Sequence, residues 1–221
     1  MKLIYFNIPG KAEAIRLCAT VGNVEMEDVR LTGDEFAAMK STMPYGQVPA
    51  LDLGDGKMLA QSSAILRYVA AVGGLHPTDP LAAAHVDALV AEEEDMFAGL
   101  SVSRYGPRFG FPMTDEYRSQ VRQKLNDEIL PKHLSFLERK LAESTTGWLA
   151  GTEKPSIADF VFVPRLQWLV SGANTGIDNH LLAAFPKVTG LLSKMMALPE
   201  VVAWYEKHSP DPLAGGAVGV V

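Results

Sequence analysis

Strand-forming residues are confined to the first third of this chain, and their confinement restricts the folds that the chain can adopt. Short runs rich in β-forming residues occur at Lys2–Phe6, Glu25–Leu31, Val48–Leu53 and Met58–Ala60. Between and after these runs, apolar residues recur at three- and four-residue steps, as in helices that bury one face. The pattern predicts an α/β domain over residues 1–74 with the order β-α-β-α-β-β-α.

The rest of the chain shows long helical periods and almost no strand signal, which predicts an all-α domain over residues 81–208. Phe160–Val170 is apolar nearly all round and predicts the buried central helix of that domain, with Ser156–Asp159 as a capping box at its start. Val121–Leu141 predicts another helix, bent at Pro131. The tail 215–219 is expected to be poorly ordered.

Composition excludes several classes of protein. The chain has 221 residues, 48% of them hydrophobic and 21% charged, so a packed protein is expected. Its net charge of -6 disfavours binding to nucleic acid or to acidic lipid, and no long apolar run predicts secretion or membrane insertion. The single Cys18 excludes an internal disulfide, which fits a reducing, cytoplasmic compartment, and no histidine spacing predicts a metal site.

A tyrosine stands where open α/β sheets commonly bind ligands. Tyr5 lies at the carboxyl end of the first predicted strand, just before a turn and a helix. Its phenol could donate a hydrogen bond to an anion, although an ordinary strand tyrosine at the edge of a core fits the same pattern. Lys11 opens the helix, where a cation opposes the helix dipole unless an anion lies nearby or the side chain points into solvent.

Two further segments could bind a peptide-like ligand. If the Val48–Pro49 bond is cis, the kink turns the backbone N–H and C=O of Val48 outward, where an extended peptide could pair with them. A plain strand-initiating proline is the alternative. Gln61 and Ser62 begin the next helix, whose free N–H groups and serine hydroxyl offer a site for a carboxylate, unless Ser62 is simply a helix cap.

In this order, the segments resemble the cytosolic glutathione transferases of the tyrosine type, with the sigma class closest. The resemblance spans nearly the whole chain and implies a thioredoxin-like N-terminal domain, an all-α C-terminal domain and a homodimer. The motifs that carry it are Tyr5-Phe6-Asn7, Gly10-Lys11-Ala12-Glu13, Ile15-Arg16-Leu17, Lys40-Ser41-Thr42, Pro44-Tyr45-Gly46-Gln47-Val48-Pro49, Gln61-Ser62, Ala64-Ile65, Arg67-Tyr68 and Ser156-Ile157-Ala158-Asp159.

The resemblance implies that Tyr5 is the catalytic residue, because its hydroxyl would donate to the sulfur of glutathione and favour the thiolate. A free thiol with a pKa of about 8.5 is only a few per cent ionised at neutral pH, so this assistance matters. Reduced glutathione is then a co-substrate, and no other cofactor is expected. By the same resemblance, the glutathione-binding residues are Tyr5, Lys11, Phe36, Lys40, Gln47, Val48, Pro49, Gln61 and Ser62.

The resemblance also implies that different residues of this set bind different parts of the glutathione tripeptide. Val48, after its cis-proline turn, would pair with the cysteinyl backbone, and Gln61 with Ser62 would hold the γ-glutamyl carboxylate. The side chains around the glycyl end would be Lys11, Lys40 and Gln47.

Three positions depart from the family pattern. Lys11 stands where many relatives have arginine, and Phe36 where tryptophan is common. Ala91 stands where the family usually has an acidic residue that reaches the glutathione amine of the neighbouring subunit. Glu92 is adjacent but faces about 100° round the helix, so its compensation for Ala91 is a hypothesis. We therefore expect weaker glutathione binding than in relatives that carry the acid.

The second substrate is less well defined. An apolar wall for an electrophile is expected from Ile8, Pro9, Met96 and Tyr105, although each of these could equally be a core or helix-end residue. Cys18 shares the apolar stripe of its helix and is assigned to the core.

The sequence as a whole predicts a cytoplasmic, homodimeric glutathione transferase that conjugates the thiolate of glutathione to apolar electrophiles, with detoxification as the favoured role. Two alternatives stay open. One is a glutathione-dependent isomerase of the prostaglandin D synthase type. The other is a non-catalytic, crystallin-like binding or structural protein.

Overall fold

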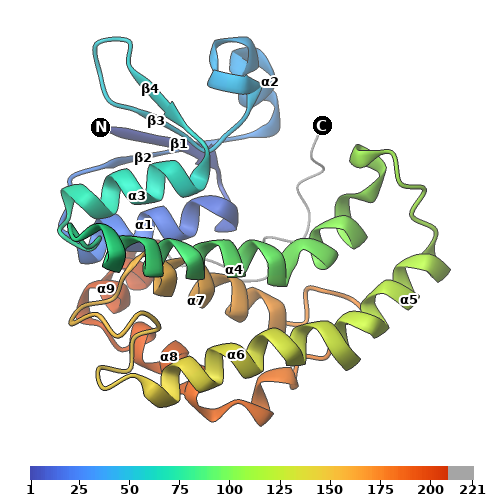
Figure 1. The fold of residues 1–221 in the computed structure, drawn as a ribbon. Helices are drawn as coiled ribbons and strands as arrows, with labels where there is room; N and C mark the ends of the chain where they lie inside the picture. The colour runs from blue at the N-terminus through green and yellow to red at the C-terminus, as the bar shows by residue number, and fades with distance from the viewer. Residues whose placement is uncertain (209–221) are drawn as a thin grey trace. The chain divides into compact units, whose positions relative to one another are not determined.

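The computed structural model describes residues 1–208, which form two compact units (Figure 1). The sheet unit consists of Met1–Ala83 together with residues 196–208, and the helical unit consists of Ala84–Met195. The boundaries expected from the sequence, at residues 74 and 81, stay a prediction. The tail expected to be poorly ordered, 215–219, lies outside the described residues.

The sheet unit contains a four-stranded mixed sheet with the strand order β2-β1-β3-β4. β1 pairs in parallel with β2, and in antiparallel fashion with β3, which in turn pairs with β4 in antiparallel fashion. This chain order confirms the predicted thioredoxin-like β-α-β-α-β-β-α pattern. The strands are β1 (Lys2–Phe6), β2 (Glu27–Leu31), β3 (Ala50–Asp52) and β4 (Met58–Ala60).

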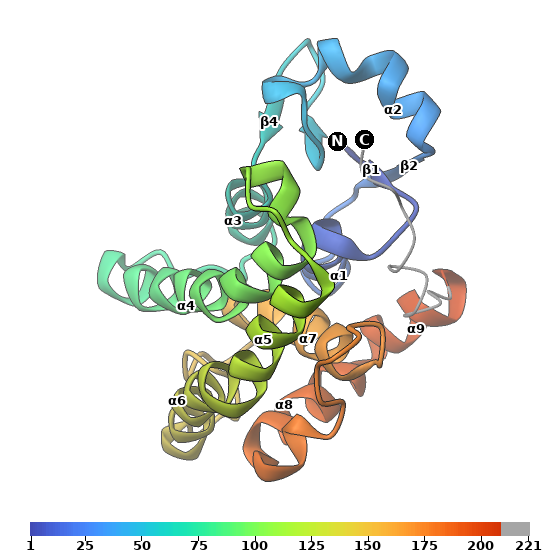
Figure 2. The same cartoon turned by 90° about the vertical axis from the view of Figure 1, so that its right-hand side faces the viewer.

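Helices cover both faces of this sheet (Figures 1 and 2). α1 and α3 lie on one side and α2 on the other, while α9 packs against α1. Because side chains alternate along a strand, Leu3 of β1 is buried in one layer and Ile4 enters a separate apolar cluster that includes Phe36. These helices are α1 (Glu13–Val21), α2 (Gly33–Met39), α3 (Ser62–Val72) and α9 (Pro199–His208).

The helical unit is built around α7 (Ile157–Val170), as its sequence predicts. Phe160, Phe162, Val163 and Leu166 are all fully buried, so this helix buries side chains on more than one face. The predicted capping box at its start is confirmed. The surrounding helices are α4 (Pro80–Tyr105), α5 (Asp115–Lys124), α6 (Leu130–Glu143) and α8 (Pro186–Met196).

The segment predicted as one helix bent at Pro131 is divided in the structure. A π-helical turn at Leu125–Ile129 lies between α5 and α6, and Pro131 lies in the first turn of α6, directly after it. This π turn is an irregularity of the helix, and it directly precedes the proline at which the sequence predicts a bend. Among residues 1–208, none of the helices combines the length and the apolar content that a bilayer crossing requires.

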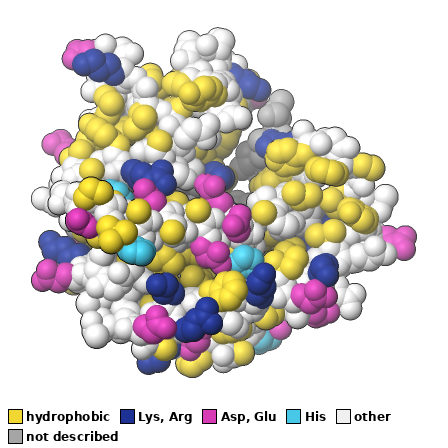
Figure 3. Space-filling model, viewed as in Figure 1, with side chains coloured by type: hydrophobic (Ala, Val, Ile, Leu, Met, Phe, Trp, Pro, Cys, Tyr) yellow, Lys and Arg dark blue, Asp and Glu magenta, His cyan; other side chains and the backbone are white. Residues whose placement is uncertain are grey.

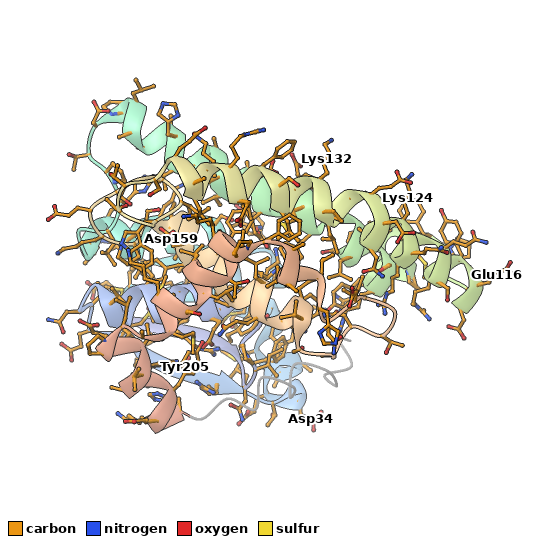
Figure 4. All side chains as sticks on the ribbon, turned by 90° about the horizontal axis from the view of Figure 1, so that it is seen from below. Asp34, Glu116, Lys124, Lys132, Asp159 and Tyr205 are labelled. Atoms are coloured by element: carbon orange, nitrogen blue, oxygen red, sulfur yellow. The ribbon has the colours of Figure 1, made fainter. Side chains whose placement is uncertain are left out.

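Asp159 joins the start of α7 to the preceding loop from a completely buried position (Figure 4). Its carboxylate accepts hydrogen bonds from the backbone N–H of Leu149 at 2.9 Å and of Ser156 at 2.8 Å. Burial nevertheless raises the pKa of Asp159 from 3.8 to about 6, while these hydrogen bonds act to lower it.

This shift predicts a pH-dependent contribution to stability. The folded chain binds more protons at Asp159 than the unfolded chain between the two pKa values. The stability that the protonated form contributes is therefore fully present below about pH 4 and is lost as the pH rises through about 6. Relative to Asp159→Asn, which cannot ionise, the wild type should lose about 2–3 kcal/mol of unfolding free energy between about pH 4 and 7. Urea unfolding followed by circular dichroism measures this difference, and a pH-independent difference would contradict the prediction.

Candidate active site

The Tyr5 hydroxyl lies at the junction of β1 and the turn that leads into α1. The side chain is 8% exposed, and its hydroxyl oxygen accepts a hydrogen bond from the backbone N–H of Lys11 at 3.2 Å. An accepted hydrogen bond polarises the O–H bond and makes the hydroxyl a stronger donor. The ring packs edge-on against Phe6, with centroids 5.5 Å apart, which limits its rotation.

Gly10 allows the turn to approach this hydroxyl. Its backbone has a φ of +44°, in the left-handed region, and a Cβ at this position would lie 2.5 Å from the Tyr5 oxygen. Any larger residue would therefore displace the phenol or the turn.

A completely buried arginine, Arg16, also holds this turn in place. The Arg16 guanidinium forms salt bridges with Asp28 on β2 at 3.0 Å and with Glu13 at 3.2 Å. It also donates to three backbone carbonyls, so the end of β1 and the turn are bound to one side chain. These carbonyls belong to Phe6, Ile8 and Pro9.

α9 adds a further member to this buried network. Burial raises the pKa of Tyr205, and the Glu13 carboxylate, which accepts its hydrogen bond, raises it further. Tyr205 projects from α9 (Figure 4) and, through Glu13, links that helix to the arginine that holds the turn.

The second predicted segment lies beside the end of β1. Phe36 on α2 packs edge-on against Phe6, with centroids 5.2 Å apart, and the Lys40 Nζ lies 5.9 Å from the centroid of Phe36. Phe36 therefore fills this position with an aromatic ring and leaves the Lys40 ammonium beside it. Lys40 and Gln47 are both exposed.

The Val48–Pro49 peptide bond is cis, and strand β3 begins only at Ala50. Within residues 1–208, neither the N–H nor the C=O of Val48 is paired. The backbone groups proposed for an extended ligand are therefore present and lie next to the sheet.

The third segment begins α3. Gln61 has a φ of +70° and makes no side-chain cap, so the first N–H groups of α3 lack a partner from its side chain. A positive φ in a residue other than glycine costs on the order of 1–3 kcal/mol and is characteristic of ligand sites. The Ser62 side chain is half-buried at this helix end, where the helix dipole favours an anion.

The strand register brings the three segments to one end of the sheet. Ile4 of β1 is paired with Ala50 of β3, which is paired with Ala60 of β4. Tyr5, Val48–Pro49 and Gln61 lie directly beyond this row of paired residues, at the same end of the sheet. A phenol, a pair of backbone groups and a helix N-terminus therefore lie side by side. An extended ligand with a carboxylate at one end could contact all three.

Comparisons with known proteins identify the family of the chain. Residues 1–71 match the model of the glutathione S-transferase N-terminal domain, and residues 108–208 match that of the C-terminal domain. Glutathione S-transferase S1 of Drosophila melanogaster is 33% identical over 93% of this chain and 78% of its own. The chain belongs to the glutathione S-transferase family.

Two prostaglandin synthases are also similar to this glutathione transferase. Hematopoietic prostaglandin D synthase of Gallus gallus is 30% identical over 94% of this chain and 96% of its own. The solved structure of prostaglandin synthase D of Nilaparvata lugens matches with a TM-score of 0.80 and 27% identity, over 93% of this chain and 96% of its own.

The four residues expected to form the electrophile wall are divided between the two units. Ile8 and Pro9 are half-buried in the sheet unit, whereas Met96 is fully buried and Tyr105 half-buried in the helical unit. Their role as a wall stays a prediction.

Glu92 has a partner within its own chain. Its carboxylate lies 2.5 Å from Nδ1 of His133 on α6, and the adjacent Glu93 forms a salt bridge with Arg165 at 2.8 Å. These contacts hold the two carboxylates against the helical unit, while Ala91 is exposed. Within residues 1–208, no group of three or more potential metal ligands is found.

Sequence patterns did not identify three residues that shape the site. Gly10 appears in a motif, but its proximity to Tyr5 depends on the path of the turn. Arg16 is flanked by apolar residues in α1, and a charged residue amid an apolar stripe is the signal that could have indicated a buried ion pair. Tyr205 lies almost two hundred residues from its partner, so no local pattern reveals their contact.

Replacing Gly10 with alanine should displace the Tyr5 hydroxyl and lower kcat for glutathione conjugation roughly 10²-fold, as expected for a catalytic group moved by about 1 Å. Gly54→Ala is the matched control, because Gly54 also has a positive φ, +87°, yet nothing lies within 4 Å of its Cβ position. Both variants should lose about 1–2 kcal/mol of stability, but only Gly10→Ala should lose activity. Equal kcat values in the two variants would contradict the prediction.

Arg16 and Arg30 bind different oxygens of the same carboxylate, which allows a matched comparison. Arg16 meets Asp28 at 3.0 Å with a 0% exposed side chain, whereas Arg30 meets it at 2.7 Å with a 27% exposed side chain. Arg16→Met should lower the unfolding free energy by about 3–5 kcal/mol, because buried carboxylates lose their partner. Arg30→Met should lower it by about 1 kcal/mol or less. Urea unfolding of both variants tests this, and similar losses would refute it.

Proposed function

We propose that this glutathione transferase is a tyrosine-type, sigma-class-like enzyme that adds the thiolate of glutathione to apolar electrophiles. The observation that carries the proposal is the Tyr5 hydroxyl, which accepts from the Lys11 N–H at the same sheet end as Val48 and α3. In this role Tyr5 donates to the sulfur of bound glutathione and stabilises its negative charge.

The chemistry requires the thiol proton to leave before the sulfur attacks. Each unit of decrease in the thiol pKa corresponds to about 1.36 kcal/mol of thiolate stabilisation. One well-placed hydrogen-bond donor, in a site partly shielded from water, can supply this stabilisation. With an aryl halide as the acceptor, the C–S bond forms and the C–halogen bond breaks. The halide leaves with the electron pair, and the thiol proton passes to solvent.

The remaining residues are proposed to hold the tripeptide along the sheet end. The unpaired N–H and C=O of Val48 suit the cysteinyl backbone, and Pro49 fixes the approach of that segment. The N-terminus of α3, with Gln61 and Ser62, suits the γ-glutamyl carboxylate. The glycyl end is assigned to Lys11, Lys40 and Gln47, beside Phe36.

A homodimer, a cytoplasmic location and a role in detoxification are proposed as the typical setting of this family. Glu92 is assigned to the fold of its own subunit, because His133 binds its carboxylate. We therefore propose that Ala91 leaves the glutathione amine without the acidic partner that many relatives supply.

A glutathione-dependent isomerase is the second candidate, because several of the similar proteins are prostaglandin synthases. The same thiolate would serve in both reactions, so the two proposals differ only in the acceptor. Product analysis with an endoperoxide substrate distinguishes isomerisation from conjugation. A non-catalytic binding protein is the third candidate, and an unshifted thiol pKa in the wild-type complex would favour it.

Tyr5→Phe removes the proposed donor and keeps the ring. The pKa of bound glutathione should rise toward the free value of about 8.5, and conjugation at neutral pH should slow about 10- to 100-fold. The thiolate absorbance of the complex, titrated against pH, measures the first effect, and steady-state kinetics with 1-chloro-2,4-dinitrobenzene measure the second. Tyr117→Phe, at an exposed tyrosine of α5, is the control. If both variants match the wild type, Tyr5 is not the donor.

A further inference from the structure

The turn between Tyr5 and Lys11 is held by charged residues that lie beneath the surface. On the face that the space-filling view shows, charged side chains of both signs lie where water surrounds them (Figure 3). Arg16 and Glu13 of α1 are buried instead, so each charge must be satisfied by partners within the protein. The donors that serve the Glu13 carboxylate therefore decide how the guanidinium is held.

One nitrogen of Arg16 has more acceptors than hydrogens. Its Nη1 carries two N–H groups. Three acceptors surround it: the carbonyl oxygen of Ile8 at 2.8 Å, the Glu13 carboxylate at 3.2 Å and the carbonyl oxygen of Pro9 at 3.4 Å. The carboxylate and the two carbonyls of the turn thus compete for the same hydrogens.

The distances show that the turn is favoured in this competition. Hydrogen bonds from a guanidinium to a carboxylate are normally about 2.7–2.9 Å long, and they are stronger than those to a neutral carbonyl. Here the order is reversed, since the neutral Ile8 oxygen lies at 2.8 Å and the Glu13 oxygen at 3.2 Å. A second donor to Glu13 explains the reversal, because a carboxylate that is already served draws the guanidinium less strongly.

Tyr205 of α9 is that second donor. α9 packs against α1, and the Glu13 carboxylate accepts a hydrogen bond from the Tyr205 hydroxyl. Burial raises the pKa of Tyr205 and the Glu13 charge raises it further, whereas the Arg16 charge lowers it. The phenol of Tyr205 therefore keeps its proton at neutral pH and stays a donor.

A displacement of Arg16 would reach Tyr5 by two routes. The Ile8 and Pro9 carbonyls belong to the turn whose Lys11 N–H donates to the Tyr5 hydroxyl. The guanidinium carbon also lies 5.9 Å from the centroid of the Tyr5 ring. A cation beside a phenol favours its ionised form and so makes the hydroxyl a stronger donor.

We propose that Tyr205 is a positioning residue for conjugation, which acts on the phenol of Tyr5 without touching the substrate. Its hydroxyl satisfies Glu13, so the Arg16 guanidinium stays bound to the carbonyls of the turn and the phenol stays aligned with the sulfur. The inference rests on the proposed function, because it concerns the donor that this function assigns to Tyr5. It gives α9 a part in thiol activation, although no residue of α9 is among those proposed to contact glutathione.

Tyr205→Phe removes only the hydroxyl. Glu13 should then draw the guanidinium away from the turn, and the thiol pKa of bound glutathione should rise by about 0.5–1 unit. With 1-chloro-2,4-dinitrobenzene at a pH below the thiol pKa of both proteins, kcat should fall roughly three- to tenfold. At a pH above both values the difference should vanish. KM for glutathione should change less than about twofold, because the network holds the turn and not the segments proposed to bind the peptide.

Val201→Ala is the matched control. Val201 is fully buried on the same helix, so its truncation weakens the packing of α9 but leaves the Tyr205 hydroxyl in place. Urea unfolding should show that this variant is less stable than the wild type, while its thiol pKa stays unchanged. Amide hydrogen exchange at Lys11 reports on the turn itself, and it should be faster in Tyr205→Phe but not in Val201→Ala.

The double variant of Tyr5→Phe and Tyr205→Phe shows whether the effect passes through Tyr5. In the Tyr5→Phe background no phenol is left to position, so adding Tyr205→Phe should not raise the thiol pKa any further. The same rise in both backgrounds would overturn the proposal, as would equal shifts in Tyr205→Phe and Val201→Ala. Failure of Tyr205→Phe to fold would overturn it too, because the hydroxyl would then support the whole chain.

Two results separate this inference from the proposed function. If Tyr5→Phe raises the thiol pKa and Tyr205→Phe does not, the inference fails alone. If Tyr5→Phe leaves the thiol pKa at the wild-type value, the donor role of Tyr5 fails first, and the positioning role of Tyr205 is lost with it.

Discussion

The active site depends on one buried guanidinium. Arg16 has no exposed side-chain surface, so its charge is stable only because Glu13 and Asp28 face it and three carbonyls accept its remaining hydrogen bonds. Two of those carbonyls belong to the turn that leads from Tyr5 to Lys11. The same contacts that satisfy a buried charge therefore also fix the distance between a phenol and a backbone N–H. Stability and catalytic geometry are here properties of one network.

The sheet brings the turn after β1 to the same end as two other segments with polar groups. Because β1 and β3 are antiparallel, the end of β1 lies beside the start of β3. β3 and β4 are also antiparallel, so the start of β3 lies beside the end of β4. Three segments that are distant in sequence then end in a row, each with a different polar group. A rigid row suits a ligand of fixed length, since little conformational entropy is lost from the protein on binding. The fixed register of the strands thus fixes the spacing of the three polar groups.

Residue patterns predicted the parts of this site that are local, and missed those that depend on distant contacts. The order of strands and helices along the chain, the capping box of α7 and the helix start at Ser62 follow from short-range chemistry, and the structure confirms them. The burial of Arg16 and its link to Tyr205 were not predicted, because their partners are set by the packing of α1 and α9. The bend at Pro131 stays a prediction, and the π turn at Leu125–Ile129 was not predicted, because its hydrogen-bond pattern requires the backbone itself.

The two units satisfy their buried arginines in different ways. Arg16 is enclosed by carboxylates, so its field is cancelled within a few ångströms and its role is structural. In the helical unit, by contrast, Arg122 donates to the Thr175 carbonyl and to the Ser103 hydroxyl, which satisfy its N–H groups without cancelling its charge. Arg118 is intermediate, because it donates both to the Ser103 carbonyl and to the Asp115 carboxylate. A carbonyl and a carboxylate both accept from a guanidinium, but the bond to the carboxylate is the stronger one and only the carboxylate cancels the charge. The net charge of a chain therefore does not show which of its buried arginines are neutralised.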